Sequence, residues 1–217
     1  MTALRQSLGL FGILVLFGCA PAAEEQEAGI MTVGLKARVE SGGNVFDVEV
    51  TAVDGPAVTM ETRWNGRTIS ERTLYRGIYA LTGSESGSAY VNQLDPAEID
   101  KLFPLKVGNE TSFHSRYRVA SRPGAGQAYI YASVRDKTVI EIRSGSYDVF
   151  VIDVVTDLAF EGQTSQFTKT VWYAPALGLN LKTKISDGEK TFYSRVLSIE
   201  LPRQTPMREN TVGTVMI

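Results

Sequence analysis

Apolar and polar residues alternate along most of the chain beyond residue 45. Phe46, Val48 and Val50 alternate with acidic residues and a threonine, and the same pattern returns over residues 58–62. A period of two places successive side chains on opposite faces of a strand, so both segments are predicted to be half-buried β-strands. The intervening Asp54-Gly55-Pro56 has the residue types of a tight turn.

Glycine-containing turns continue this pattern. Asn65-Gly66 is a strong hairpin signal, because both residues tolerate the positive φ angles of a type I′ turn. A third strand is predicted over residues 68–81, and a break at Gly77 is left open. Residues 83–88 are rich in Gly and Ser but lack the Gly-Lys-Ser/Thr ending of a phosphate-binding loop, so they are predicted to be a flexible connection.

One segment has the signals of a helix. Asp95 can cap its first turn, Pro96 stands at the first helical position, and Glu98 complements the helix dipole. Pro104 cannot continue a helix, so the predicted helix covers residues 96–103.

The second half of the chain returns to strands. Residues 113–119 alternate, and residues 129–135 and 138–143 are predicted to pair as a hairpin. Asp136-Lys137 would form the tip of that hairpin. Residues 147–158 are apolar on both faces, which is typical of a central strand covered on both sides. Three further strands are predicted at 166–173, 179–185 and 191–201.

These elements predict a mainly β fold. Nine or ten strands joined by short turns form an antiparallel curved sheet, either a half-barrel or a small barrel, with one short helix. Such a sheet has to close on itself or cover its edges and its apolar face. We expect a single β-rich domain over residues 44–202 and a flexible C-terminal tail over residues 203–217.

The N-terminal segment has the features of an export signal. Arg5 supplies a positive charge, and the apolar run over residues 8–17 is too short to span a bilayer, which needs about 20 residues. Leu16-Phe17-Gly18-Cys19 then resembles the bacterial lipobox, although Phe17 is bulky at a position that is usually small. The alternative is an ordinary secretory peptide that contains a cysteine by chance.

The lipobox resemblance implies an anchored protein. Residues 1–18 would be a lipoprotein signal peptide, and Cys19 would carry the acyl chains that hold the protein to a membrane. Residues 19–43 would form the lipidated tether. The residue after Cys19 is Ala20, not the Asp that often marks inner-membrane retention, so the periplasmic face of the outer membrane is the expected location.

Composition narrows the function classes without naming one. The 217 residues are 43% hydrophobic and 21% charged, which is typical of a globular domain. Without the signal segment, which contains Arg5, 21 basic and 24 acidic residues remain. Nucleic acid is therefore not an expected partner, because its binding requires clustered Lys and Arg.

Side chains suited to catalysis are scarce. His114 is the only histidine, and it lies on the polar side of an alternating strand, which favours a surface position. Asp47 with Glu49, and Asp148 with Asp153, are carboxylate pairs that structural ion pairing explains better than glycosidase chemistry. Asp153 interrupts the most apolar strand, so burial there would require a partner such as an Arg. We predict no catalytic residues, no cofactor and no metal site.

Aromatic residues are spread over many of the predicted strands. Tyr can bury its ring while its hydroxyl keeps a hydrogen bond, which suits a filled core and also an apolar cavity with a wet opening. Both interpretations stay open. The candidate lining residues of such a cavity are Phe113, Tyr117, Tyr129, Tyr131, Trp172 and Tyr173.

Three segments of the second half resemble a family of uncharacterised bacterial secreted proteins and lipoproteins. They are FPLKVG at 103–108, GSYDVFVI at 145–152 and WYAPALG at 172–178. The family shares F-P-L-x-x-G, G-x-F/Y-x-x-F/Y-x-I and W-Y-x-P-x-x-G in this order. The resemblance implies a curved sheet of the lipoprotein-carrier (LolA/LolB-like) type, which cups acyl chains against a helix, and it implies no catalytic residues.

Two residues of the third segment have a predicted structural role. Pro175 cannot donate a backbone hydrogen bond and should end a strand, and Gly178 should supply a positive φ for the turn that follows.

The expected function is a lipid-anchored, non-catalytic envelope module that binds a hydrophobic ligand or lipid. A structural or interaction protein that docks an envelope partner is the alternative, and a glycan hydrolase is the third hypothesis.

Overall fold

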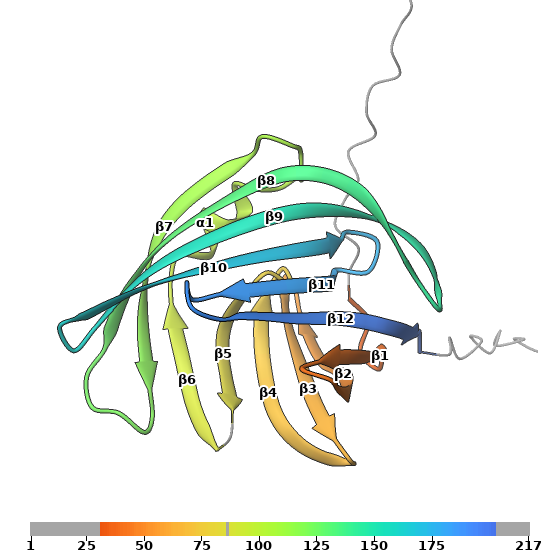
Figure 1. Cartoon of the computed structure of the whole chain (residues 1–217), viewed down its shortest axis with the longest axis horizontal. Helices are drawn as coiled ribbons and strands as arrows, with labels where there is room; N and C mark the ends of the chain where they lie inside the picture. Colours follow the sequence, from red (N-terminus) through yellow and green to blue (C-terminus); the bar gives the residue numbers. More distant parts are fainter. Residues whose placement is uncertain (1–30, 86, 203–217) are drawn as a thin grey trace, which may run out of the picture.

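The computed structural model describes residues 31–85 and 87–202. The predicted signal peptide (1–18), Cys19, much of the tether and the tail at 203–217 lie outside these residues. The described part confirms the mainly β fold with one short helix: its strands form a closed antiparallel barrel of twelve strands (Figure 1). A small barrel was one of the two forms expected from the alternating pattern.

Each strand of the barrel pairs with its neighbours in sequence, and the single helix lies between the sixth and seventh strands. The elements are β1 (Lys36–Ser41), β2 (Asn44–Asp54), β3 (Ala57–Trp64), β4 (Arg67–Tyr75), β5 (Tyr79–Glu85), β6 (Ser88–Gln93), α1 (Pro96–Asp100), β7 (Glu110–Val119), β8 (Gly126–Ile142), β9 (Gly145–Phe160), β10 (Gln163–Ala174), β11 (Leu179–Ser186) and β12 (Thr191–Glu200).

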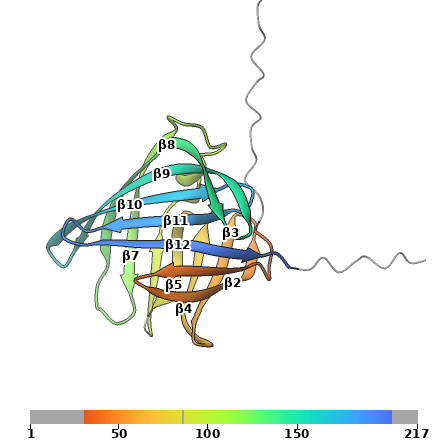
Figure 2. The ribbon, with the colours of Figure 1, turned by 45° about the vertical axis from the view of Figure 1, so that its right-hand side comes forward.

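The first and last strands close the barrel. Strand β1 pairs with β12, from Lys36 opposite Glu200 to Ser41 opposite Ser194, and this leaves no open sheet edge (Figure 2). Because β1 lies within residues 19–43, the prediction that this whole range is tether was wrong at its C-terminal end. Its apolar side chains are few, but Ala37 is buried in the barrel.

The two rims of the barrel differ. Because strands alternate in direction, α1 and the turns at 55–56, 76–78, 143–144 and 175–178 lie at one rim, which we call the helix end. The turns at 42–43, 65–66, 120–125, 161–162 and 187–190 lie at the other rim, the hairpin end. Both ends of the described chain leave from the helix end (Figure 1).

The predicted hairpin with Asp136-Lys137 at its tip is wrong. Strand β8 runs without interruption across this sequence and pairs along its length with β9. The register shifts between Val134 and Asp136, so Arg135 is the extra residue of a β-bulge. Three consecutive charged residues at a bulge have the polarity of a turn, which explains the error.

Two other boundaries also differ from expectation. Much of the predicted loop at 83–88 belongs to the paired strands β5 and β6. The helix is shorter than residues 96–103, although its start is as predicted: Pro96 is at its first turn, and Asp95 accepts a hydrogen bond from the Ala97 backbone at 3.0 Å. The break at Gly77 is confirmed, since β4 ends at Tyr75 and β5 begins at Tyr79.

The lumen near the helix end is packed. Ile99 and Leu102, from α1 and the turn after it, are almost fully buried against side chains that point inward from the strands. Burial of apolar surface in this cluster, which we call the helix-end core, stabilises the helix end of the barrel. Its strand members include Tyr75, Phe113, Ile130, Ile152, Val171 and Tyr173.

Strand β9 is covered on both faces, as predicted. Phe150 and Ile152 belong to the helix-end core, whereas Val149 belongs to a second buried cluster that includes Ala174 and Leu177. Successive residues of β9 are therefore buried on opposite sides of the sheet.

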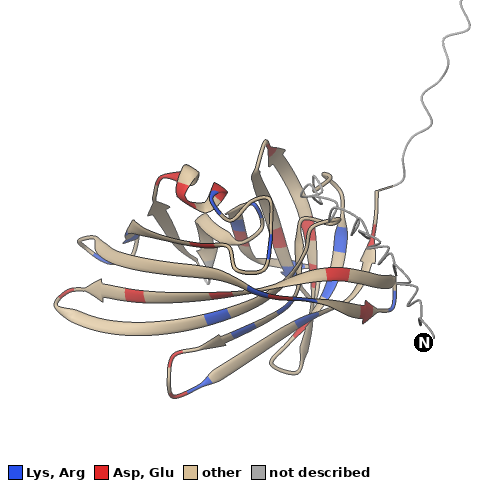
Figure 3. Ribbon diagram, turned by 90° about the horizontal axis from the view of Figure 1, so that it is seen from above, with Lys and Arg blue, Asp and Glu red and all other residues tan. Residues whose placement is uncertain are grey.

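The tip of the β8–β9 hairpin reaches β12. The Arg143 backbone N–H donates to the Leu197 carbonyl at 3.1 Å, and the Ile199 N–H donates to the Ser144 hydroxyl at 3.2 Å. These bonds fix the curled tip at the helix end. Basic and acidic positions are interspersed along the strands in this view (Figure 3).

Candidate ligand site in the barrel lumen

The part of the lumen that the helix does not reach is hollow. A cavity of about 470 Å³ lies between β1–β5 on one side and β10–β12 on the other. Inward-pointing aliphatic side chains form most of its wall, among them Val39, Val48, Met60, Leu74, Leu181 and Ile185. A volume of this size lies in the range of small-molecule sites, about 300–1,000 Å³.

A lysine points into this apolar cavity. Lys169 of β10 pairs in register with Val154 and Ile185, so it takes a lumen position between aliphatic neighbours. Its Nζ donates to the Ile78 carbonyl at 3.0 Å. Burial and, to a smaller extent, the positive charge of Arg72 lower the pKa of Lys169 to about 8.

The turn between β4 and β5 folds inward to meet this lysine. Asn180 Nδ2 donates to the Gly77 carbonyl at 2.7 Å, next to the Ile78 carbonyl that Lys169 binds. Gly77 has φ +69°, and a Cβ at this position would collide with the Gly178 carbonyl oxygen. Only glycine fits this approach.

Two buried polar atoms of the cavity wall have no partner within the described chain. They are the Ser70 hydroxyl and the Asn180 Oδ1. A buried polar atom without a hydrogen bond costs about 1–3 kcal/mol, so both atoms point to a further molecule in the lumen, either water or a ligand.

The charged residues along the described cavity wall are all basic. Arg72 and Lys169 line it, whereas Arg195, which also borders it, is paired with Glu40 at 2.7 Å and lies opposite the outward-facing Lys182 in the register. No Asp or Glu is among the described lining residues. A cavity of one sign attracts ligands of the opposite charge.

Apolar side chains are exposed where the cavity approaches the hairpin end. Ile69 and Ile185 line the cavity and are 40% and 39% exposed. Phe192, which faces Ile185 in the β11–β12 register, is 58% exposed. Exposed apolar residues at a cavity border are consistent with an entrance for an apolar ligand.

The six aromatic residues predicted from sequence are not part of this wall. Phe113 and Tyr173 are buried in the helix-end core, where burial raises the pKa of Tyr173 to about 12. Tyr117 packs against the ring of Phe160 at 6.3 Å. The prediction of an aromatic lining is therefore wrong for this cavity, whose wall is mainly aliphatic.

The other three aromatic residues also lie away from the lumen cavity. Tyr129 and Tyr131 are 42% and 38% exposed, and the Tyr131 hydroxyl donates to Glu110 at 2.6 Å. Trp172 stacks with the ammonium of Lys182, 4.3 Å from the centre of its ring. Only Tyr129 borders a hollow, a shallow one that also includes His114.

The lumen residues leave a signal in the sequence that aromatic content obscured. On β10, Lys169 shares its alternation phase with the apolar Val171 and Tyr173. On β4, Arg72 shares its phase with Leu74. A charged residue on the apolar phase of a strand indicates a polar group inside a barrel.

The carboxylates considered for hydrolysis are all ion-paired. Asp153 is 3.2 Å from Arg135 Nε and accepts a hydrogen bond from Thr170 at 2.7 Å, so the expected arginine partner is present. Asp148 lies 3.3 Å from Lys137 Nζ. His114 packs against Tyr129, with ring centres 5.2 Å apart. In the strand register Tyr129 lies opposite Asp157, so His114 is not aligned with Asp148 or Asp153.

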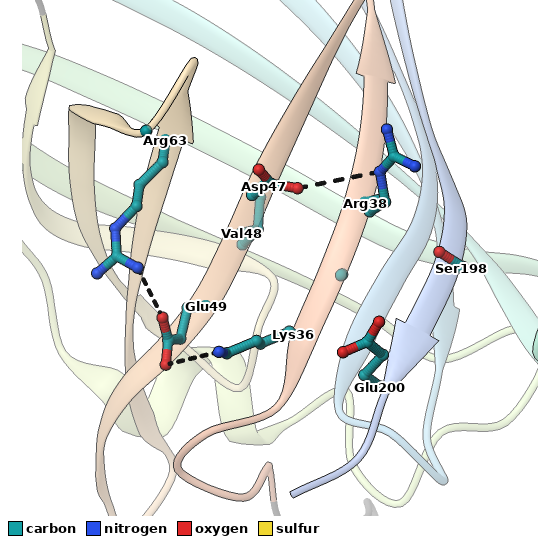
Figure 4. A pocket seen from close by; sticks show the side chains of 10 residues that line it. Lys36, Arg38, Asp47, Val48, Glu49, Arg63, Ser198 and Glu200 are labelled. Atoms are coloured by element: carbon teal, nitrogen blue, oxygen red, sulfur yellow. Dashed lines mark hydrogen bonds and ion pairs between the residues drawn. The ribbon is translucent and has the colours of Figure 1, made fainter.

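A second hollow lies on the outer face of the barrel, over β1–β3. Glu49 stands between Arg63, at 2.9 Å, and Lys36, at 3.9 Å (Figure 4). Asp47 lies 4.0 Å from Arg38. These charges neutralise one another on exposed strand faces, which is the arrangement of a structural ion-pair network.

Residues of the three family-like segments meet at the helix end. The rings of Phe103 and Tyr173 are in edge-to-face contact at 6.3 Å, and Phe150 faces Tyr173 in the β9–β10 register. Strand β10 ends before Pro175, and Gly178 has φ +65°, as predicted. The three segments therefore form part of the helix end of the barrel.

Residues 31–85 and 87–202 contain no group of three or more His, Cys, Asp or Glu placed to hold a metal ion. In the same part of the chain, no helix has the length and apolar character needed to cross a membrane.

No family model matches the sequence, and no curated protein matches it. Among solved structures, one with a TM-score above 0.5 shares the fold. The hypothetical lipoprotein YmcC from Escherichia coli (K12) has a TM-score of 0.54 and 10% identity over 77% of this chain and 85% of its own. A predicted exported protein with a YmcC-like fold from Bacteroides fragilis gives 0.47 and 10% identity, over 81% of this chain and 100% of its own.

A predicted lipoprotein from Parabacteroides distasonis has a TM-score of 0.45 and 9% identity, over 81% of this chain and 99% of its own. At these identities the likeness concerns the fold alone. The chain thus has a barrel similar to that of the lipoprotein YmcC.

Proposed function

We propose that this chain is a lipid-anchored envelope protein that binds a small hydrophobic or amphipathic ligand in its barrel lumen, without catalysis. The cavity of about 470 Å³ between β1–β5 and β10–β12 carries this proposal. Its aliphatic wall with a few polar groups is the composition expected of a ligand site. The ion-paired carboxylates support a role without catalysis.

The anchor rests on the sequence. Cys19 follows a short apolar run and a lipobox-like Leu-Phe-Gly, and the barrel is similar to that of a hypothetical lipoprotein. The proposed location is the periplasmic face of the outer membrane, because Ala20 follows Cys19. Labelled palmitate should enter the wild-type protein but not the Cys19→Ala variant. Equal labelling of both, or none in the wild type, would contradict the anchor.

Ligand binding can be tested with N-phenyl-1-naphthylamine, a neutral apolar dye that fluoresces in dry sites. It should bind with saturation to the wild-type barrel. Met60→Trp places a large ring in the cavity and should weaken this binding at least tenfold. Val91→Trp is the control, because Val91 is exposed and lies outside the cavity wall.

Two results would count against a binding module. The first is an absence of saturable dye binding together with an absence of retained lipid in native mass spectrometry of gently extracted protein. The second is equal dye binding by Met60→Trp and the wild type. Either result would favour the alternative of a protein that docks an envelope partner.

A further inference from the structure

We infer that the lumen ligand is a single-chain amphiphile with an anionic headgroup, and that Lys169 binds this headgroup while the acyl chain lies along the aliphatic wall. This inference rests on the proposed function and adds the chemical class of the ligand.

The first argument is the incomplete coordination of Lys169. An ammonium group has three donors, and the described residues give it one acceptor, the Ile78 carbonyl at 3.0 Å, and no ion pair. Lys169 is half-buried, and a charge partly removed from water without a counter-charge is unfavourable. A carboxylate or phosphate in the cavity would supply both the counter-charge and the further acceptors.

The second argument is the sign of the charges around the lysine. Arg72 on β4 lies close enough to Lys169 to lower its pKa, and the described lining residues include no acid. An anion is attracted by this set of charges and a cation is repelled.

The third argument places the headgroup in the lumen. Lys169 and Asn180 bind the neighbouring carbonyls of Ile78 and Gly77, so their polar groups lie close together beside the β4–β5 turn. Asn180 Oδ1 is buried without a partner and can accept a hydrogen bond from a hydroxyl or water that accompanies the headgroup. The aliphatic wall extends from there past Val39 to Ile69.

A purely structural role for Lys169 is the competing explanation, since its bond to Ile78 pins the β4–β5 turn. The affinities for ligands of different charge distinguish the two roles. If Lys169 only holds the turn in place, its removal should change the affinity for all ligands alike. If it binds a headgroup, its removal should change the affinity for anions only. Lys169→Arg keeps a positive charge and Lys169→Met removes it at similar length, so this pair isolates charge from shape.

The experiment measures displacement of N-phenyl-1-naphthylamine by four ligands of equal chain length: dodecanoate, dodecyl phosphate, dodecanol and dodecyltrimethylammonium. In the wild type, one or both anions should bind at least tenfold more tightly than the alcohol, and the cation should bind least. Lys169→Met should lose this preference for anions and keep the affinity for dodecanol, while Lys169→Arg should retain most of it.

Lys182→Met is the matched control. Lys182 lies on the neighbouring strand β11 but stacks against Trp172 outside the lumen, so its removal should change no affinity. The anion preference of the wild type should also decline above a pH of about 8, where empty Lys169 loses its proton, and this decline should be absent in Lys169→Arg.

The outcomes separate the two proposals. If the dye binds but anions and alcohol displace it equally well, or if Lys169→Met keeps the anion preference, the headgroup inference is overturned and the binding module remains. If neither dye nor amphiphile binds, both fail. Tighter binding of dodecyl phosphate than of dodecanoate would identify a phosphate headgroup, and the reverse a carboxylate.

Discussion

The two halves of the barrel have the same alternating pattern and different interiors. In the packed half, strands β7–β10 surround α1 and the turn after it, and Ile99 and Leu102 fill the lumen. In the hollow half, strands β1–β4, β11 and β12 surround a cavity of about 470 Å³. The period of two decides which side chains point inward, but the connection between β6 and β7 decides whether the space is filled.

The two halves should also contribute differently to the stability of the fold and to the proposed ligand binding. Apolar side chains of the packed half contact one another and stabilise the fold, because they are removed from water on all sides. Side chains of the hollow half line the cavity and keep part of their surface free of protein contacts. Four predictions follow this contrast, in decreasing order of expected effect.

Truncation of an apolar side chain should be most harmful in the packed half. Leu102→Ala should lower the free energy of unfolding by about 4 kcal/mol, because Leu102 is 1% exposed and its removal leaves a new void. Leu74→Ala should lower it by about 2 kcal/mol or less, because Leu74 is half-buried and borders an existing cavity. Urea unfolding of both variants measures the contrast, and equal losses would contradict it.

The inward β4–β5 turn, which borders both halves, should tolerate no side chain. Gly77→Ala should lower the free energy of unfolding by about 3 kcal/mol, since its Cβ would meet the Gly178 carbonyl oxygen and its φ is +69°. Gly66→Ala has a similar φ of +76° but open space around it, and should lose only about 1 kcal/mol. Thermal and urea unfolding should rank the two variants in this order; the opposite order would show that the turn is not tightly packed.

The charge of Lys169 should make the hollow half less stable at neutral pH. Its pKa falls from 10.5 to about 8 on folding, so the unfolded chain binds more protons between these values, and stability of the wild type should rise with pH across this window. Below pH 8, Lys169→Met should be more stable than the wild type by about 2 kcal/mol, after about 1 kcal/mol for the lost bond to Ile78. This advantage should disappear towards pH 10.5.

Urea unfolding of both proteins at pH 7 and pH 10 gives the measurement. A stability difference that does not change with pH would show that Lys169 titrates normally and is well solvated.

The outer ion-pair network should matter least. Glu49→Gln removes the partner of Arg63 and Lys36, and should change the free energy of unfolding by about 0.5 kcal/mol at most, because exposed pairs are screened by water and salt. Displacement of N-phenyl-1-naphthylamine by dodecanoate should be unchanged. A weaker affinity in this variant would locate the ligand site on the outer face and not in the lumen.

Sequence reasoning found those parts of the fold that depend on local pattern. The strand around Val48 and the helix start at Asp95 were predictable, because alternation and capping involve residues close together in the chain. Strand β1 was missed, since only Ala37 and Val39 carry its apolar phase and Gly42-Gly43 follow it. Its pairing with β12 joins the two ends of the domain sequence. A pattern of neighbouring residues cannot predict such a long-range contact.

The site was less predictable than the fold. Aromatic residues were favoured as lining, but Phe113 and Tyr173 pack the half that the helix fills. Which inward side chains border a void depends on where the connecting segments enter the barrel, and this is a property of the whole chain. Lys169 and Arg72, each on the apolar phase of its strand, were the local clues.

An antiparallel ring with an even number of strands returns the chain to the rim where it began, as the pairing of Lys36 with Glu200 shows. The twelve residues from Cys19 to the described start of the chain at Met31 can extend over at most about 40 Å. With Cys19 as the point of attachment, the tether would therefore join the barrel at its helix end, and the exposed apolar residues of the hairpin end would lie at the opposite rim.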